Sequence, residues 1–352
     1  MKKNIYVIGG AGFIGSNFIN YILTKKNFNI INIDKISYSS NKNFINNKND
    51  KTYFFYKSDI ANKKKISLIL KKHQPFRIIN FAAYTHVDNS IEDELKYLKN
   101  NVLSLQIFLD TLKKYLNKKK MKNFKYHHIS TDEVYGDVSF KSNIKFNEST
   151  KYNPKNPYAA SKAAADHVVK VWSKLYKIPT CITFCSNNFG PNQFIEKLIP
   201  KTILSFLNNK KMEIYDRGEN IRNWIYVYDH SKILLEILLR KNLTGEFNIS
   251  TKYYFSNKNL VKKIFTLLVS KKIKTNFKNF KSFIKFVQDR PAHDRKYNIA
   301  STKINKTVKI SKFLSKFDIS LNKTIDWYLL NEKFYKSKKL FLKRQGLIKK
   351  IK

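Results

Sequence analysis

The sequence predicts an α/β protein with a Rossmann-type, doubly wound parallel sheet and a smaller C-terminal α/β lobe. Three observations support this fold class. Short apolar runs alternate with amphipathic helical patterns, glycines gather at the first strand-to-helix turn, and polar residues follow the ends of the predicted strands. Alternating strands and helices are typical of parallel sheets, in which ligands bind beyond the carboxyl ends of the strands. We therefore expect a ligand site along that edge.

Residues 5–8 form the first predicted strand, and a helix with an apolar face follows from about Phe13. Between them lie four of the nine glycines in the chain, in the pattern Gly9-Gly10-x-Gly12-x-x-Gly15. Glycine permits the tight turn and a close approach of the backbone to a pyrophosphate, while the helix N-terminus faces the phosphates. The turn thus predicts a dinucleotide cofactor, contacted by Gly9, Gly12, Phe13, Ile14 and Gly15.

The second predicted strand covers residues 29–33, and Asp34 follows Gly15 by nineteen residues. A carboxylate at this position accepts both adenosine-ribose hydroxyls and repels a 2′-phosphate, which favours NAD over NADP. Further strands are expected at residues 53–56, 77–81 and 124–129, with helices at 66–72, 95–116 and 158–176. The remaining cofactor contacts are predicted at Lys35, Asp59, Ile60, Ala82, Ala83, Asn100 and Asn188.

The strand at 124–129 leads into Thr131, Asp132 and Glu133, which places two adjacent carboxylates at the expected ligand edge. They form either an ordinary loop or a separate acid and base, if their environments push their pKa values apart.

Tyr158 and Lys162 lie at i and i+4 of a predicted helix, so both face one side. An ammonium group beside a phenol favours the phenolate, a base that can take a proton from a sugar alcohol. A surface Tyr-Lys pair is the alternative, and the preceding motifs argue against it.

The net charge of +44 raises nucleic acid or an anionic membrane as a partner. Lysine, however, is spread along the whole chain without a nucleic-acid-binding motif, and only residues 336–352 form a dense basic tail. Neither partner is therefore expected. The apolar runs are far shorter than the roughly 20 residues that span a bilayer. Because Cys181 and Cys185 fit neither a disulfide nor a metal site, we expect a cytoplasmic protein without a bound metal.

The glycine turn together with Tyr158-x-x-x-Lys162 resembles the extended short-chain dehydrogenase/reductase superfamily. Within it, Ser-Thr-Asp-Glu-Val-Tyr-Gly at residues 130–136 is similar to the dTDP-glucose 4,6-dehydratases, and the likeness runs from residue 1 to about Tyr328. Sugar epimerases of the superfamily usually carry small or hydroxyl residues in place of Asp132 and Glu133. Further matching segments are 86–88, 185–191, 196–200, 221–224, 227–230 and 289–294.

The resemblance implies dehydration of dTDP-glucose to dTDP-4-keto-6-deoxyglucose, with a tightly bound NAD that is reduced and regenerated in each cycle. Tyr158, assisted by Thr131 and Lys162, would take the proton of the carbon 4 hydroxyl. Glu133 would remove the proton on carbon 5, and Asp132 would protonate the hydroxyl that leaves carbon 6. The family pattern places substrate contacts at Thr85, His86, Asn187, Glu196, Lys197, Arg222, Asn257, Arg290 and His293. The cations among them suit a nucleotide diphosphate.

The chain departs from the family pattern at several positions that are not catalytic. Ser39-Ser40 stands where Ala-Gly is usual, Tyr84-Thr85 where Glu-Ser is usual, Ser250-Thr251 where Gly-Gly is usual, Asn223 where aspartate is usual, and Ala292 where glycine is usual. We expect the effect to be a lower efficiency or stability. Four histidines lie outside the motifs and are expected to be structural or exposed: His73, His127, His128 and His167.

Residues 1–180 are expected to form the NAD-binding domain, with returns to the sheet near 181–190 and 221–250, including a strand at 225–228. Residues 191–335 would form the substrate-binding lobe. The helices at 95–117 and 158–176 carry apolar faces for packing between subunits, and the resemblance implies a homodimer. Two other functions remain open. Asp132 and Glu133 argue against a nucleotide-sugar epimerase or decarboxylase of the same fold, and the intact Thr131, Tyr158 and Lys162 argue against a non-catalytic nucleic-acid-binding Rossmann protein.

Overall fold

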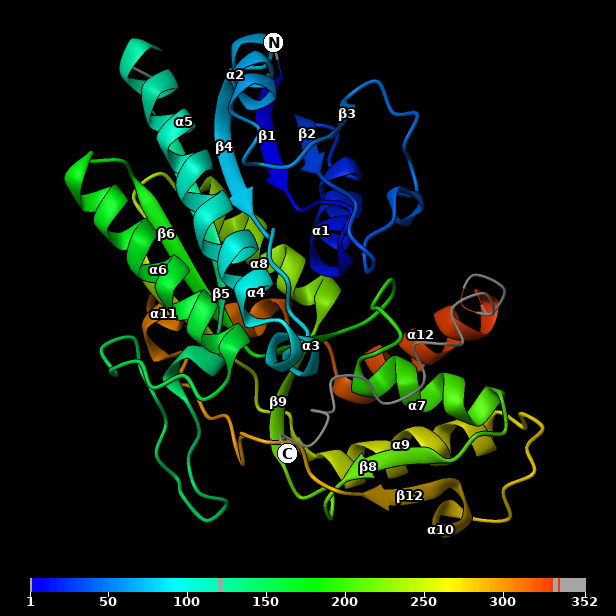
Figure 1. The fold of residues 1–352 in the computed structure, drawn as a ribbon. Helices are drawn as coiled ribbons and strands as arrows, with labels where there is room; N and C mark the ends of the chain where they lie inside the picture. The colour runs from blue at the N-terminus through cyan, green and yellow to red at the C-terminus, as the bar shows by residue number, and fades with distance from the viewer. Residues whose placement is uncertain (1, 120–122, 332–334, 336–352) are drawn as a thin grey trace.

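A computed structural model describes residues 2–119, 123–331 and 335, and a central sheet of seven parallel strands organises this part of the chain (Figure 1). Across the sheet the strands lie in the order β10 (Gly245–Ile249), β6 (Thr180–Cys185), β5 (Lys125–Thr131), β4 (Pro75–Asn80), β1 (Lys3–Ile8), β2 (Phe28–Asp34) and β3 (Tyr53–Lys57). Strand order reverses at β1, which pairs with both β2 and β4. Such a switch point opens a crevice at the carboxyl ends of the strands, and the predicted fold class is confirmed.

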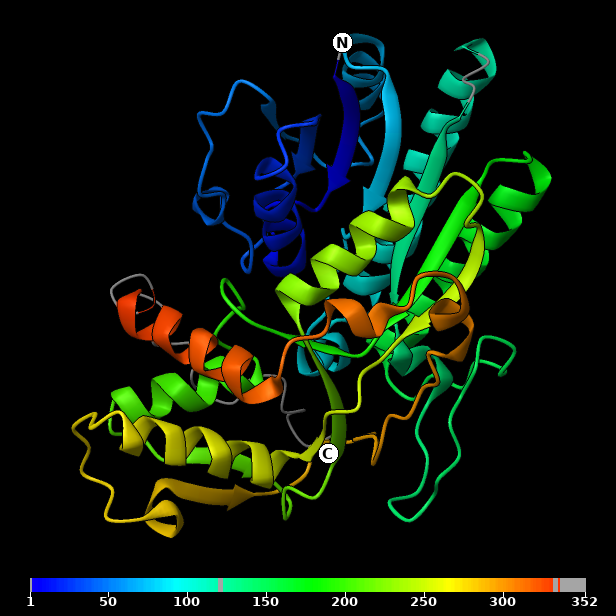
Figure 2. The same ribbon diagram turned by 180° about the vertical axis from the view of Figure 1, so that it is seen from behind.

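Helices cover both faces of this sheet (Figures 1 and 2). One face is covered by α2 (Lys63–Lys72), α5 (Ser104–Lys119) and α6 (Pro157–Leu175), and the other by α1 (Phe13–Leu23), α8 (Val227–Leu239) and α11 (Thr302–Thr307). Alternate residues of β1 show why both faces must be covered. Tyr6 and Ile8 belong to the first core, whereas Ile5 and Val7 belong to the second, because successive side chains of a strand point to opposite faces.

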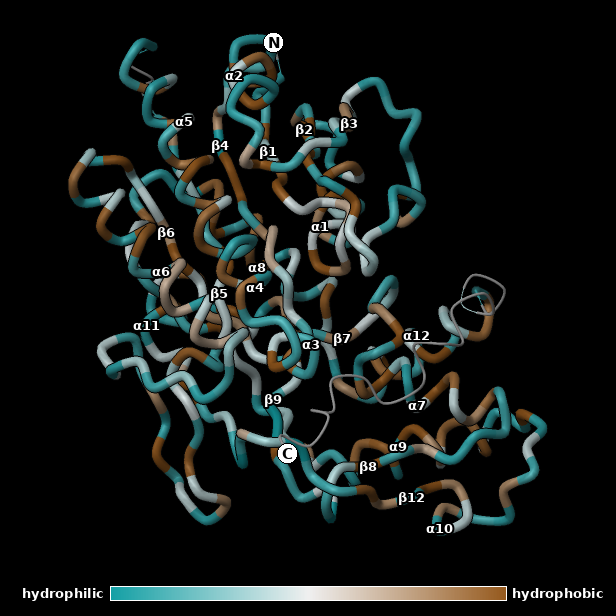
Figure 3. The backbone as a smooth tube through the Cα atoms, viewed as in Figure 1, coloured by the Kyte–Doolittle hydropathy of each residue, from teal (hydrophilic) through white to brown (hydrophobic). Residues whose placement is uncertain are grey.

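A second lobe surrounds a third hydrophobic core and lies below the sheet in Figure 1. Its strands form a three-stranded sheet, β11 (Tyr254–Ser256), β9 (Ile221–Tyr226) and β7 (Asn187–Phe189), and a two-stranded sheet, β12 (Ile284–Val287) and β8 (Met212–Tyr215). Its helices are α7 (Leu198–Leu207), α9 (Asn257–Ser270), α10 (Phe280–Phe283) and α12 (Phe317–Leu330). Figure 3 shows that hydrophobic residues lie at the centre of the main sheet, as in β4, and that most residues of the outer loops are hydrophilic.

The predicted return of residues 225–228 to the main sheet is wrong. β9 ends at Tyr226 and pairs with β7 and β11, and Val227 begins α8, which packs against α1. The last strand of the main sheet is β10, inside the broader predicted range 221–250. A short apolar run does not reveal which sheet it joins. Here the strand pairs with β7 and β11, and the buried amide of Asn223 adds a bond to the carbonyl of Thr251 at 2.8 Å within the lobe.

The helix expected over residues 95–116 is interrupted. The chain instead forms α3 (Val87–Glu92), α4 (Glu94–Leu98), a π turn (Lys99–Leu103) and then α5. The buried amide of Asn101 lies in the π turn, accepts from the backbone N–H of Tyr84 at 2.8 Å and donates to the Ser161 hydroxyl at 2.9 Å. Single π turns often occur at functional sites, and this one joins the loop after β4 to α6.

The domain boundaries stay a prediction, and the basic tail at 336–352 lies outside the described residues.

Candidate active site

Two adjoining cavities lie beyond the carboxyl ends of the strands. The first is lined by every residue predicted to contact the cofactor: Gly9, Gly12, Phe13, Ile14, Gly15, Asp34, Lys35, Asp59, Ile60, Ala82, Ala83, Asn100, Tyr158, Lys162 and Asn188. The second holds His86, Arg222, Asn257, Arg290 and His293. Glu133, Thr85, Asn187, Glu196 and Lys197 border both cavities, whereas the other predicted catalytic residues, Thr131, Asp132, Tyr158 and Lys162, line the first.

The glycine turn leaves room for a diphosphate. Gly9 has φ +76°, and a Cβ atom there would lie 2.7 Å from the backbone nitrogen of Ala82. A Cβ atom on Gly15 would lie 2.5 Å from the carbonyl oxygen of Gly9, so Gly15 is required by packing within the turn and Gly9 by packing against the backbone that follows β4. Gly12 differs, because the nearest atom to its Cβ position is 3.3 Å away and the residue lines the first cavity. A side chain at Gly12 would therefore occupy space that a ligand needs.

Asp34 ends β2 with its carboxylate held by two backbone amides. The N–H of Ala11 donates to one oxygen at 3.0 Å, and that of Ile36 donates to the other at 2.7 Å. Burial raises the pKa of Asp34, and both amides act in the opposite direction. Lys35 turns away and bonds to Asp59 at 3.3 Å and Asn100 at 2.5 Å. The carboxylate of Asp34 also lines the first cavity, so Asp34 fits the predicted role of accepting ribose hydroxyls.

The two adjacent carboxylates occupy different environments on a 3₁₀ turn (Asp132–Tyr135) that follows β5. Asp132 is buried, and its Oδ2 atom has no hydrogen-bond partner among the described residues. Burial and the neighbouring Glu133 raise the pKa of Asp132 to about 8. Glu133 instead accepts from Asn156 at 3.4 Å and lies 3.2 Å from the Tyr297 hydroxyl. Asp132 thus carries a proton at neutral pH and can act as an acid, whereas Glu133 is placed to act as the base.

Tyr158 lies in the first turn of α6, which begins at Pro157 and is capped by Asn156. Burial, Glu133 and Cys185 raise the pKa of Tyr158, and a contact with the Thr131 hydroxyl lowers it. Lys162 donates to the carbonyl of Ile129 at 2.8 Å, and no hydrogen bond within the described residues joins it to the Tyr158 hydroxyl. The predicted lowering of the phenol pKa is therefore not found in the protein by itself, because burial outweighs it.

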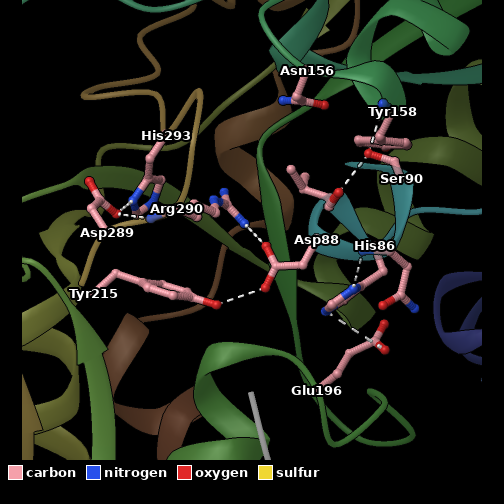
Figure 4. A network of polar contacts seen from close by, with 12 residues as sticks. His86, Asp88, Ser90, Asn156, Tyr158, Glu196, Tyr215, Asp289, Arg290 and His293 are labelled. Carbon is pink, nitrogen blue, oxygen red and sulfur yellow. Dashed lines mark hydrogen bonds and ion pairs between the residues drawn. The ribbon is translucent and has the colours of Figure 1, made fainter. Parts of the chain in front are cut away.

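A polar network holds the far end of the second cavity (Figure 4). Asp88 accepts from the Arg290 guanidinium at 2.9 Å and from the Tyr215 hydroxyl at 2.7 Å, and His293 pairs with Asp289 at 2.6 Å. The Nε atom of Arg290 is buried and has no partner among the described residues. A guanidinium with a free N–H at the end of a cavity suits an oxyanion such as phosphate.

Glu196 sits at the junction and accepts from the Tyr38 hydroxyl at 3.1 Å, with His86 Nε2 3.9 Å away. Burial raises the pKa of Glu196 and lowers that of His86 to about 3. Lys197 donates to the carbonyl of Thr85 at 2.9 Å. The amino groups of Arg222 bond to the carbonyls of residues 221, 294 and 295. The direct phosphate contact predicted for Arg222 thus stays a prediction, since the protein already engages those groups.

Sequence reasoning missed several members of the site. Tyr297 donates to Asp294 at 2.5 Å and lies 3.2 Å from Glu133, and the Arg222 guanidinium stacks 4.2 Å over its ring. Burial raises the pKa of Asp294 to about 6. A signal was available, because Asp294 ends a segment that matches the family and Tyr297 follows it by three residues. Asp88 also belongs to a matching segment, but its partner Tyr215 is 127 residues away and has no local signal.

Three residues that depart from the family pattern, Asn223, Thr251 and Tyr84, are accommodated by their neighbours. Asn223 both donates to the Thr251 carbonyl at 2.8 Å and accepts from its N–H at 2.9 Å, so two of the departing residues pair with each other. The ring of Tyr84 lies 4.8 Å from the Lys35 ammonium, a cation–π contact where the usual glutamate would offer a charge.

Ala292, in contrast, has φ +51°, where glycine is favoured. Ala292→Gly is expected to raise the free energy of unfolding by up to about 1 kcal/mol, because the left-handed region costs an L-residue about that much. The added flexibility of glycine in the unfolded chain reduces the gain. Thermal unfolding of the variant measures this change in the free energy of unfolding. Ala300→Gly, at a position without a positive φ, is the matched control and should lower stability. A lower melting temperature for Ala292→Gly than for the wild type would show that the left-handed backbone at Ala292 does not destabilise the protein.

Comparisons with known proteins agree with this geometry. The profile of the GDP-mannose 4,6 dehydratase family matches residues 6–313. A dTDP-glucose 4,6-dehydratase from Shigella flexneri is 38% identical over 338 residues, covering 93% of each chain. The crystal structure of a dTDP-glucose 4,6-dehydratase from Bacillus anthracis in complex with NAD is 33% identical, with a TM-score of 0.81 over 97% of this chain and all of that one. A further one from Streptomyces venezuelae, with NAD bound, is 29% identical, with a TM-score of 0.85 over 97% and 100% of the two chains.

Proposed function

The chain belongs to the dTDP-glucose 4,6-dehydratases, within the family described as GDP-mannose 4,6 dehydratases, and we infer that it converts dTDP-glucose to dTDP-4-keto-6-deoxyglucose with NAD. One observation carries this inference beyond membership. A proton-bearing Asp132 and a hydrogen-bonded Glu133 line the first cavity together with Tyr158, and Glu133 also borders the second. An epimerase or decarboxylase needs the tyrosine for sugar oxidation, but it does not need this acid and base for removing water.

The first cavity provides what NAD requires. The glycine turn and the N-terminus of α1 suit the diphosphate, Asp34 suits the adenosine ribose, and Asn188 lies at the inner end beside Ser186. His230 contacts the Asn188 amide oxygen at 2.8 Å and so fixes the orientation of that amide. When bound, NAD supplies the chemistry of accepting a hydride from sugar carbon 4 and returning it to carbon 6.

The side chains at the junction divide the proton transfers among them. Tyr158 takes the proton of the carbon 4 hydroxyl, with Lys162 providing positive charge behind it and Thr131 contacting the phenol. The resulting ketone acidifies carbon 5, from which Glu133 takes a proton. Asp132 donates its proton to the hydroxyl leaving carbon 6, which departs as water. When the hydride returns to carbon 6, Glu133 gives its proton back to carbon 5. Each turnover therefore leaves Tyr158 with an extra proton and Asp132 without one, and both residues must be reset.

The second cavity takes the nucleotide diphosphate. Arg290 offers its unpartnered Nε–H, and Lys197 adds a positive charge at the border of the two cavities. Asp88 accepts a hydrogen bond from the Arg290 guanidinium, and Tyr215 donates one to Asp88. Together they keep the guanidinium in place. A charge-assisted, directional contact of this kind binds phosphate more specifically than a mobile surface lysine does.

Partners and location follow as further proposals. Exposed apolar side chains on α4, the π turn and α6 (Leu95, Leu98, Leu103, Val171 and Leu175) support a homodimer that buries these helices. Within residues 2–119, 123–331 and 335, no helix is long and apolar enough to cross a membrane. Cys181 and Cys185 are both buried free thiols, which suits the cytoplasm.

The function is tested by incubating the purified protein with dTDP-glucose and measuring the alkali-induced absorbance of a 4-keto-6-deoxy sugar. UDP- and GDP-glucose serve as competing substrates at the same concentration. Product from dTDP-glucose is the expected result. Turnover of a UDP- or GDP-sugar without turnover of dTDP-glucose would overturn the substrate assignment, and an epimerised sugar would overturn the reaction.

The alkaline side of the pH profile reports on the acid. Because the pKa of Asp132 is raised to about 8, the proton-bearing form dominates below that pH and is lost above it. The value of kcat is therefore expected to fall as the pH rises past about 8, roughly tenfold for each further unit. The measurement is kcat against pH for the wild type and for Asp132→Asn. If the same alkaline fall persists in Asp132→Asn, another group is responsible for it.

A further inference from the structure

Lys162, the lysine of the catalytic pair, has a buried carboxylate behind it that no step of the reaction uses. Asp166 follows Lys162 by one helical turn on α6 and is fully buried. Tyr158, Lys162 and Asp166 are spaced four residues apart, so they form one stripe along the helix, each about 6 Å from the next. The stripe begins at the first cavity and ends inside the protein core.

His128 on β5 lies between the lysine and the carboxylate. Its Nε2 atom is 3.2 Å from the Lys162 ammonium and 3.4 Å from an oxygen of Asp166. Burial and Lys162 lower the pKa of His128 to about 4, so the ring is neutral at physiological pH and can accept from the ammonium. The other oxygen of Asp166 accepts from the Ser130 hydroxyl at 2.6 Å, which fixes the carboxylate in place.

We propose that Asp166 is a positioning residue that keeps Lys162 in its charged form, with His128 as the neutral group between them. The proposal rests on the dehydratase function for its catalytic meaning, because a neutral Lys162 would not favour the phenolate of Tyr158. Burial of an ammonium group without a counter-charge strongly disfavours the charged form. Lys162 is 3% exposed, and its nearest bonds are to a neutral ring and a carbonyl.

The groups that face Lys162 come from three elements. On α6 these are Tyr158 and Asp166, on β5 His128, and on β6 Cys185. Burial raises the pKa of the Cys185 thiol to about 12, so it is neutral, and its Sγ donates to the Ser130 carbonyl. Burial lowers the pKa of Lys162, and Asp166 raises it. Among the described groups around the ammonium, Asp166 is therefore the anion that offsets burial.

On its outer side Asp166 meets the hydroxyl of Tyr152 at 3.4 Å. Lys170 donates to that hydroxyl at 3.0 Å and pairs with Glu246 at 2.8 Å near the surface. These contacts leave the charge of Asp166 unchanged and support its position only weakly. Tyr152→Phe is accordingly a matched control, because it removes one hydrogen bond to Asp166 and keeps the carboxylate.

The first test is the pH dependence of turnover in Asp166→Asn holoenzyme. Loss of the carboxylate removes the charge that raises the pKa of Lys162, so less of Lys162 is charged, the pKa of Tyr158 rises, and the acidic limb of kcat against pH moves to higher pH. The expected shift is at least about one unit, which is a loss of roughly tenfold near pH 7 that recovers on raising the pH. Tyr152→Phe is expected to leave the limb in place. A loss of the same factor at every pH would indicate a merely structural role and overturn the proposal.

The second test needs no activity and so separates this proposal from the dehydratase function. Melting temperatures are measured for the wild type, Lys162→Met, Asp166→Asn and the double variant. Asp166→Asn is expected to lower the melting temperature of the wild type but to raise that of Lys162→Met, where the carboxylate would be buried without its partner. Equal effects in both backgrounds would show that the two charges are independent. Even if Asp166→Asn alone does not fold, recovery in the double variant supports the pairing and its absence refutes it.

Discussion

Replacing Glu133 with glutamine is expected to stop the reaction after the first oxidation, so that reduced nicotinamide accumulates on the enzyme. Glutamine keeps the size of the side chain and can still bond to Asn156 and Tyr297, but it cannot take the proton from carbon 5. Loss of a general base lowers kcat by about 10²–10⁴-fold. Because Tyr158 and Lys162 are untouched, oxidation at carbon 4 should proceed in a single turnover to a level that approaches the concentration of active sites.

The measurement is the absorbance of reduced nicotinamide after mixing the Glu133→Gln holoenzyme with dTDP-glucose, beside the yield of 4-keto-6-deoxy sugar. Glu246→Gln is a suitable control, since that carboxylate pairs with Lys170 outside the site. Dehydration at the wild-type rate would remove Glu133 from the role of base. Failure to form reduced nicotinamide would show that Glu133 is also needed for the first oxidation.

Replacing Tyr158 with phenylalanine is expected to prevent the first oxidation itself. The variant keeps the ring that packs with Val87 and Tyr97 in a small cluster, and the backbone N–H that donates to the Ser90 hydroxyl at 3.1 Å remains. Only the hydroxyl that receives the carbon 4 proton is lost. The expected loss in kcat is again about 10²–10⁴-fold, but without accumulation of reduced nicotinamide.

The contrast between Tyr158→Phe and Glu133→Gln is the informative result, because both block product formation at different steps. Melting temperature and bound NAD should match the wild type in both variants. Tyr176→Phe, at the end of the same helix and partly exposed, controls for loss of a hydroxyl on α6. If Tyr158→Phe forms reduced nicotinamide as fast as the wild type, another group takes the carbon 4 proton.

Thr131 contacts both of the residues whose protonation must be reset, Tyr158 and Asp132. Its hydroxyl donates to Asp132 at 3.4 Å and contacts Tyr158, so it lies between the residue that gains a proton and the residue that loses one. The stripe of Tyr158, Lys162 and Asp166 extends from the same point into the core. The protonation states of the site are thus coupled through side chains that bond to one another.

Much of the fold was predictable because its signals are local. The first strand, the glycine turn and α1 lie within the first 23 residues, and Gly15 is required by a close approach to Gly9 inside that segment. The interrupted helix before α5 could not be predicted, because its π turn depends on bonds from Asn101 to Tyr84 and Ser161, which are 17 and 60 residues away. The placement of β9 failed for the same reason, since its partners β7 and β11 are distant in the chain.

The sequence by itself determined which chemical groups the site contains: the glycine turn, Asp34, the two carboxylates after β5, and Tyr158 with Lys162. These follow from residue types at short, fixed spacings. Only the tertiary structure decided their states and supports, namely a proton on the buried Asp132, Tyr297 beside Glu133, and His128 of β5 beside Lys162 of α6. The physical reason is that a pKa depends on burial and on neighbouring charges, and folding brings neighbours such as Tyr297 from segments more than a hundred residues away.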